Sequence, residues 1–98
     1  MRVKIPDTIR IGGFDYKITF DLINNEEGSN WGWWRNFPQK IELSKEAPAQ
    51  RRSHTFIHEL LHAIDDTYLG NKLSEDDVIG LTTGLHQVLE QLGVRFVK

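Results

Sequence analysis

The pentapeptide His58-Glu59-Leu60-Leu61-His62 has the form H-E-x-x-H. Residues four apart in an α-helix lie one turn apart on the same face, so the two imidazoles can converge on one metal ion. Glu59 stands beside the first imidazole, where its carboxylate can reach a metal-bound water instead of the metal. Zinc lowers the pKa of such a water towards about 7, and the carboxylate can accept its proton during attack on a carbonyl. The motif therefore predicts His58 and His62 as zinc ligands and Glu59 as the general base of a peptidase.

A zinc site of this kind needs a third protein ligand, which must be His, Asp or Glu because the chain has no Cys. Three acids follow Ser74 at the start of the second predicted helix. Of these, Asp76 projects away from the predicted apolar face. Ser74 and Asp77 fit a capping box, which gives Asp77 a structural role. We expect Glu75 to be the ligand and keep Asp77 as the alternative, although acids at a helix N-terminus are favourable without any metal.

Other polar residues are candidates for supporting roles. Asp66 lies one turn after the motif and could orient an imidazole, although a solvated helix end explains it equally well. His54 lies one turn before the motif, and three consecutive turns do not easily reach one ion, so we expect it at the surface or at a pocket rim. His86, Tyr68 and Arg35 are candidates for stabilising an oxyanion. For His86, a place at the edge of the core is the commoner role.

Trp31, Trp33 and Trp34 stand within four residues of one another. They could cover the sheet, form an apolar wall beside the metal, or make a docking patch for a partner. Stacking on nucleic acid bases would need a basic surround, and only Arg35 and Lys40 are near. We expect the first two roles.

Alternation of apolar and polar residues predicts strands in the first half of the chain. Residues 9–11 and 14–22 flank Gly12-Gly13, which is a two-residue hairpin signal. The segments that follow are a polar loop (24–30), an extended segment (31–35) and a further alternating strand (39–44).

Apolar residues recur at helical spacing in the second half, over residues 49–69 and 74–92, and Gly70 and Gly93 are fitting helix stops. A last short strand could follow at residues 94–97. This order predicts a single α+β domain over residues 1–98, with a small antiparallel sheet of about three to four strands packed against two long helices. The side chains that we expect on the inward face of the second helix are Val78, Leu81, Leu85, Val88, Leu89 and Leu92.

The composition bounds the class of protein. The chain has 98 residues and a formal charge of −2, which argues against a protein that binds nucleic acid by bulk electrostatics. It has no cysteine for disulfides, no apolar run long enough for a membrane span, and no N-terminal pattern of a signal peptide. We expect a cytoplasmic protein whose partner is a protein or peptide substrate, not nucleic acid or a membrane.

The stretch from Thr55 to Asp66, centred on the motif, resembles the minimal zincins. It is most similar to the compact phage- and mobile-element-associated metallopeptidases of the ImmA/IrrE type, and the resemblance covers about residues 39–92. It implies a zincin-like fold with a short antiparallel sheet, ligands at His58 and His62, a general base at Glu59, and an acidic ligand near Glu75. Some members of that family cleave transcriptional repressors.

Three hypotheses follow. The first is a zinc-dependent peptidase whose substrate lies along an exposed strand edge, for which we expect residues 39–44. The second is a non-catalytic, zinc-containing phage regulatory or protein-interaction module, in which zinc ties the two helices together. The third is a metal-free structural protein.

Overall fold

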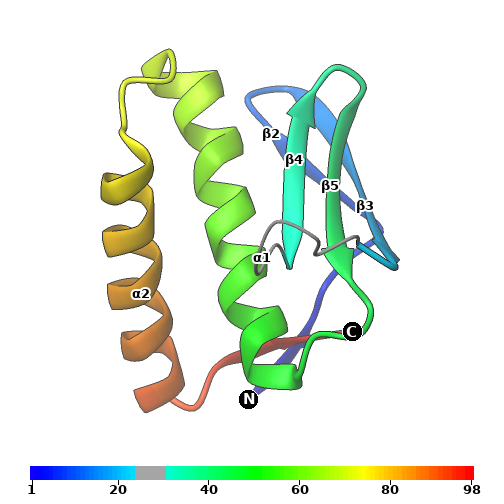
Figure 1. The fold of residues 1–98 in the computed structure, drawn as a ribbon, viewed down its shortest axis with the longest axis vertical. Coiled ribbons are helices and arrows are strands. Elements are labelled where there is room, and N and C mark those ends of the chain that lie inside the picture. The colour runs from blue at the N-terminus through cyan, green and yellow to red at the C-terminus, as the bar shows by residue number, and fades with distance from the viewer. Residues whose placement is uncertain (24–30) are drawn as a thin grey trace.

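The computed structural model describes residues 1–23 and 31–98, so the polar loop predicted at 24–30 lies outside the described residues. Its elements form three layers (Figure 1): a four-stranded sheet, helix α1 against the sheet, and helix α2 on the outer side of α1. The α+β class is therefore confirmed. The strands of the sheet are β2 (Thr8–Ile11), β3 (Phe14–Asp21), β4 (Gly32–Asn36) and β5 (Gln39–Ser44).

The sheet is mixed, in the order β2-β3-β5-β4, and the prediction of an antiparallel sheet is wrong. The β2–β3 hairpin is confirmed, and both glycines of its turn have positive φ, as a tight hairpin turn requires. β4 and β5 form a second antiparallel pair, and β5 then lies parallel to β3. Strand β5 therefore lies inside the sheet, between β3 and β4, and its side chains Ile41 and Leu43 are fully buried. The strand edge expected at residues 39–44 is therefore wrong as well, and the edge strands are β2 and β4.

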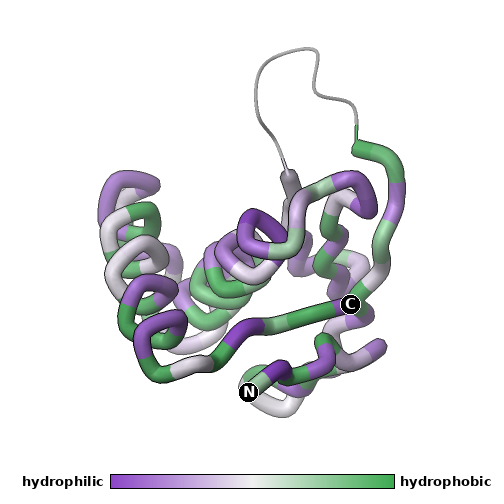
Figure 2. The backbone as a smooth tube through the Cα atoms, turned by 90° about the horizontal axis from the view of Figure 1, so that it is seen from below, coloured by the Kyte–Doolittle hydropathy of each residue, from purple (hydrophilic) through white to green (hydrophobic). Residues whose placement is uncertain are grey.

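Two short strands join the ends of the chain (Figure 2). β1 (Arg2–Lys4) pairs in parallel with β6 (Arg95–Val97), apart from the main sheet. The predicted last strand is confirmed, and its partner is a segment that the alternation did not indicate. The backbone N–H of Phe96 donates a hydrogen bond of 3.0 Å to Ser53 Oγ, and its ring packs edge-on against Phe56 of α1. The strand pair is thereby fastened to the first helix.

The two helices are α1 (Ala49–Ile64) and α2 (Glu75–Gln91). Helix α1 ends earlier than predicted, because the chain continues as a π-helical turn over Asp65–Leu69 and then reverses at Gly70, which is left-handed. Helix α2 begins with the predicted capping box, in which Ser74 Oγ accepts a hydrogen bond from the backbone N–H of Asp77 and the Asp77 carboxylate accepts one from the backbone N–H of Ser74. None of the described helices is both long enough and apolar enough to cross a membrane.

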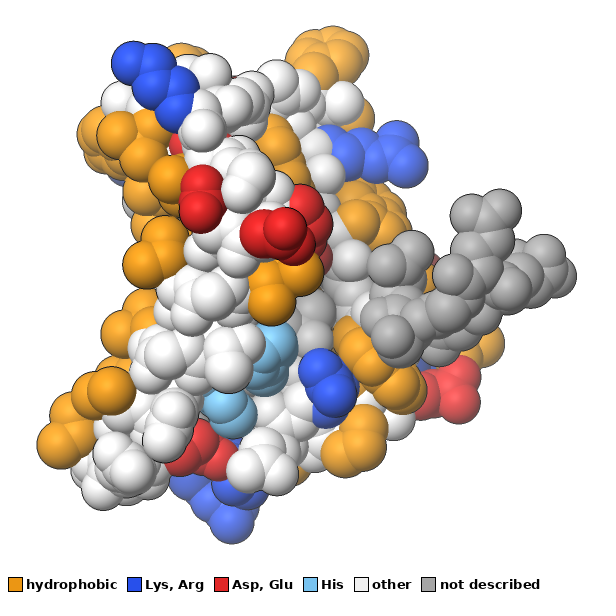
Figure 3. All heavy atoms as spheres, turned by 60° about the vertical axis from the view of Figure 1, so that its left-hand side comes forward, with side chains coloured by type: hydrophobic (Ala, Val, Ile, Leu, Met, Phe, Trp, Pro, Cys, Tyr) orange, Lys and Arg blue, Asp and Glu red, His pale blue; other side chains and the backbone are white. Residues whose placement is uncertain are grey.

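The inward face predicted for α2 is mostly wrong. Val78 and Thr82 are fully buried, whereas Leu81, Leu85, Val88 and Leu92 are exposed. Helix α2 packs on α1. The buried side of α2 carries Val78 and Thr82 and is offset from the side that carries the exposed leucines. In Figure 3 the side of the molecule that carries α2 comes forward, and hydrophobic side chains lie along the left margin of the view.

Candidate metal centre

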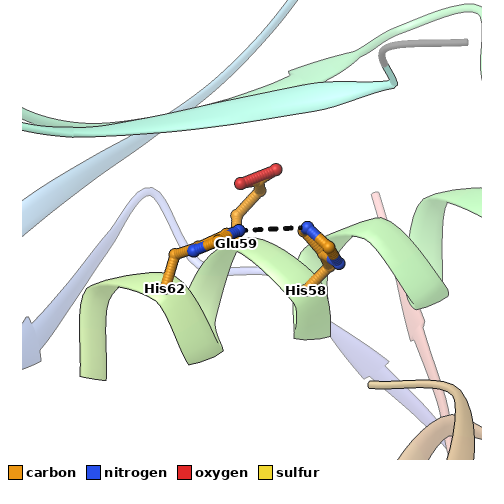
Figure 4. Close-up of side chains that lie close together, drawn as sticks. All are labelled: His58, Glu59 and His62. Atoms are coloured by element: carbon orange, nitrogen blue, oxygen red, sulfur yellow. Dashed lines mark hydrogen bonds between the residues drawn. The ribbon is translucent and has the colours of Figure 1, made fainter. Parts of the chain in front are cut away.

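The motif and the first residue of α2 meet between the two helices. Glu75 Oε1 lies 3.0 Å from His58 Nε2, and Glu75 Oε2 lies 3.1 Å from His62 Nε2. The two Nε2 atoms are 3.1 Å apart. Figure 4 shows both imidazoles on the same side of α1, joined by this contact, with the Glu59 side chain extending towards the sheet. The structure thus brings together the three residues predicted as ligands.

Local structure explains why these side chains converge. His58 and His62 are one turn apart in α1, as the helical spacing predicts. Glu75 is the first residue of α2, directly after the N-cap Ser74, so its place is set by the turn between the helices. The capping box occupies the carboxylate of Asp77, which leaves Glu75 as the acid that meets the imidazoles.

The spacing of these atoms fits a tetrahedral metal. Ligands at 2.0–2.1 Å from a tetrahedral zinc ion are about 3.3 Å from one another. The observed separations of 3.0–3.1 Å are slightly shorter, and the two that involve Glu75 end on different oxygens of its carboxylate. The donors, two imidazole nitrogens and a carboxylate, are also ones that zinc accepts. His58, His62 and Glu75 could therefore hold zinc and leave its fourth position open.

Glu59 differs from Glu75 in its surroundings. Its exposed fraction is 5%, and one of its carboxylate oxygens lies within 4.8 Å of an imidazole nitrogen of His58 and of one of His62. Burial, and next the negative charge of Glu75, raise the pKa of Glu59 to about 8. Burial is also the main cause that lowers the pKa of His58, assisted by His62 and opposed by Glu75. Desolvation thus favours the neutral form of both the Glu59 carboxyl and the His58 imidazole, and the neutral imidazole is the form that ligation requires.

A pocket of about 450 Å³ opens between β4 and α1 at this centre, lined by residues of β4 together with the motif and Glu75. Trp34 stacks on His62, with ring centroids 6.1 Å apart and planes at 14°. It also packs against the hydrophobic core, so it serves both expected roles, cover of the sheet and wall of the site. Gly32 permits the close approach of strand and helix, because a Cβ there would lie 2.8 Å from Thr55 Cγ2.

The other candidates occupy different places. His54 lines the rim of a neighbouring pocket, as expected. His86 packs edge-on against His54 and does not line the pockets at the motif, Tyr68 is exposed, and Arg35 lies over the Trp33 ring. The structure therefore brings none of the three oxyanion candidates, His86, Tyr68 and Arg35, to the centre.

Asp66 does not orient an imidazole in this structure. Its Oδ1 accepts a hydrogen bond of 2.7 Å from Asn71 Nδ2 instead. The structural role belongs to its neighbour Asp65, which is 3% exposed and whose Oδ1 accepts from the backbone N–H groups of Lys72 and Leu73 at 3.1 and 3.3 Å. Asp65 thereby fixes the turn that delivers Glu75, a role that sequence reasoning missed. The sequence carried no signal for it, because Asp65 falls inside the helix predicted over residues 49–69.

Comparisons with models of protein families, with curated proteins and with solved structures found no match.

Proposed function

We propose that this protein is a zinc-dependent peptidase of the H-E-x-x-H type. The observation that carries the proposal is the convergence of His58, His62 and the Glu75 carboxylate, in which the two imidazole nitrogens lie 3.1 Å apart and each lies 3.0–3.1 Å from one carboxylate oxygen, beside the buried carboxylate of Glu59. The open pocket against β4 supports it, because a substrate needs access to the fourth position of the metal. A zincin-like relationship to the ImmA/IrrE type is part of the same proposal.

Bound zinc would supply Lewis-acid polarisation of the substrate carbonyl and a lowered pKa of the attacking water. Glu59 accepts the proton of this water and passes it to the leaving amine. Its position suits it to both steps, since the buried carboxylate lies beside the imidazoles that would hold the metal. Trp34, stacked on His62, restrains that imidazole and shields one side of the site from water.

The substrate lies along β4. This strand is one of the two edge strands of the sheet, and its residues line the pocket at the motif. An extended peptide can therefore add to the free edge as a further strand, with its backbone held by hydrogen bonds. We take the added strand to be antiparallel, which is the commoner pairing.

The test compares the wild type with Glu59→Gln. We expect both purified proteins to hold about one zinc ion per chain by elemental analysis, and only the wild type to cleave a mixed peptide library followed by mass spectrometry. Removal of Glu59 as the base should lower the rate by a factor of about 10²–10⁴. Equal cleavage by both proteins would refute the role of Glu59, and absence of zinc from both would refute the centre itself.

A second function is favoured by one observation: the ligands come from both helices, and α2 packs chiefly on α1. Zinc in this place would fasten α2 to the rest of the domain, as a non-catalytic regulatory or interaction module requires. Zinc content without cleavage of any peptide, and partner binding unchanged in Glu59→Gln, would identify this function instead.

A further inference from the structure

A second pocket, of about 410 Å³, lies near the start of α1 and is not used by the mechanism above. It is lined by Pro48, Gln50, Arg51, His54 and His86. All of these except Pro48 carry side-chain N–H groups, and the lining includes no acid. In Figure 3 the imidazoles on this face of the molecule lie close to a basic side chain. The lining is therefore suited to an anionic group.

The charges around the pocket agree with this. Among residues 1–23 and 31–98, no acid lies within ion-pair distance of Arg51. Glu90 Oε1 lies 3.9 Å from His86 Nε2, and the Glu90 carboxylate accepts two hydrogen bonds from Arg95 and one of 3.5 Å from Gln50 Nε2 of the pocket lining. Burial, followed by the charges of His86, Arg51 and His58, lowers the pKa of His54. Arg51 thus supplies the positive charge of the pocket lining.

One ring nitrogen at the wall has no partner. His86 Nε2 is buried and makes no hydrogen bond within the part of the chain that the structure describes. A buried polar atom without a hydrogen-bond partner is energetically unfavourable. The His86 side chain is 13% exposed, so it is held in place by its packing against the His54 ring.

The pocket continues into the metal centre. A third pocket, of about 310 Å³, is lined by Arg51 and His54 as well as by His58, Glu59 and Glu75. Arg51 precedes His58 by seven residues, which is about 10 Å along a helix. An extended peptide covers that distance in about three residues. A substrate bound at the metal can therefore reach Arg51 with its second or third residue from the scissile bond.

The direction of the substrate follows from β4. Gly32 lies against Thr55 and Trp34 against His62, so β4 and α1 run in the same direction (Figure 1). A substrate antiparallel to β4 then runs from the His62 end of the site towards Arg51. The segment that reaches the second pocket is the one on the C-terminal side of the scissile bond.

We propose, on the basis of the proposed peptidase function, that the pocket of Arg51, His54 and His86 is a subsite for a carboxylate of the substrate, two or three residues after the scissile bond. Arg51 is the residue that determines this specificity. The carboxylate belongs either to an Asp or Glu side chain or to the free C-terminus of a short peptide, since both present the same group to a guanidinium.

The first experiment measures kcat/KM of the zinc-loaded protein on matched peptides. One pair carries Glu or Gln at the third residue after the cleavage site, and a second pair ends there in a free or an amidated C-terminus. We expect a preference of about 10-fold or more for the acid in at least one pair. The pair that shows it identifies the source of the carboxylate. In Arg51→Gln this preference is lost, and in Arg10→Gln, which makes the same charge change on a distant hairpin, it is retained.

The second experiment measures binding without turnover. The zinc-loaded Glu59→Gln protein is titrated with the same peptides while the ring protons of His54 and His86 are followed by NMR. We expect shifts that saturate with the acidic peptide, and about 10-fold weaker binding after the additional change Arg51→Gln. Hydrolysis with no acid preference, or a preference that survives Arg51→Gln, would overturn the subsite and leave the peptidase standing. If the acidic peptide binds in a manner that depends on Arg51 but the protein cleaves no peptide, the subsite stands and the peptidase function is refuted.

Discussion

Asp65 is the residue whose replacement tests how the fold delivers the third ligand. Its buried carboxylate accepts hydrogen bonds from two backbone N–H groups, those of Lys72 and Leu73, in the turn between the helices. Asp65→Ala removes the acceptor and leaves both N–H groups without it. We expect the turn to loosen and both the stability of the protein and its affinity for zinc to fall.

The magnitude follows from these two bonds. A hydrogen bond to a charged group contributes about 1.5–3 kcal/mol, and the longer bond here, at 3.3 Å, belongs at the low end of that range. We therefore expect Asp65→Ala to lower the free energy of unfolding by about 3 kcal/mol. For a domain of this size, that change corresponds to a loss of about 12–24 °C in Tm.

The assay is urea denaturation of the chelator-treated protein, followed by circular dichroism, so that zinc does not contribute to the result. Asp65→Asn keeps one acceptor oxygen and should lose less than half as much stability. Asp66→Ala is the matched control, because the hydrogen bond of the Asp66 side chain within the described residues goes to the exposed side chain of Asn71, and its change should stay within about 0.5 kcal/mol.

Zinc affinity supplies the second readout for Asp65. Residues that orient metal ligands typically contribute 10–100-fold to affinity, and Asp65 positions the turn that ends at Glu75. A zinc affinity of Asp65→Ala equal to that of the wild type would show that the turn does not position Glu75. A stability loss no greater than that of Asp66→Ala would refute the reasoning on the two buried bonds.

Three further predictions concern single residues. Glu75→Gln should weaken zinc binding about 100-fold or more, measured by competition with a chromophoric chelator. Asp77→Asn keeps an acceptor for the capping box and should leave zinc binding unchanged. If Asp77→Asn weakens zinc binding and Glu75→Gln does not, Asp77 is the ligand. Gly32→Ala should destabilise the protein by about 1–3 kcal/mol in urea, because its Cβ meets Thr55 at 2.8 Å, and an unchanged midpoint would show that β4 shifts freely. Thr82→Val should raise the free energy of unfolding by about 1 kcal/mol, since its buried hydroxyl has no partner within the described residues; a loss of stability would reveal a hydrogen bond there.

The sequence by itself determined the local features. The period of the apolar residues predicted both helices, and Gly12-Gly13 predicted the β2–β3 hairpin. The capping box at Ser74 was also readable, because it depends on residues three apart. The same locality explains the prediction of His58 and His62 on one face, since their spacing is a property of a single helix.

Contacts between distant segments were decided only by the tertiary structure. The place of β5 inside the sheet depends on its pairing with β3, more than twenty positions earlier in the chain, which the alternation of its own residues does not encode. The exposure of Leu81 and Leu85 depends on which side of α2 meets α1, and an apolar stripe does not reveal how much of it a partner helix will cover. The meeting of Glu75 with the motif was predicted from helical phase, yet its geometry rests on the buried hydrogen bonds of Asp65. Local propensity acts over a few residues, whereas packing and burial join residues that are close only after the chain has folded.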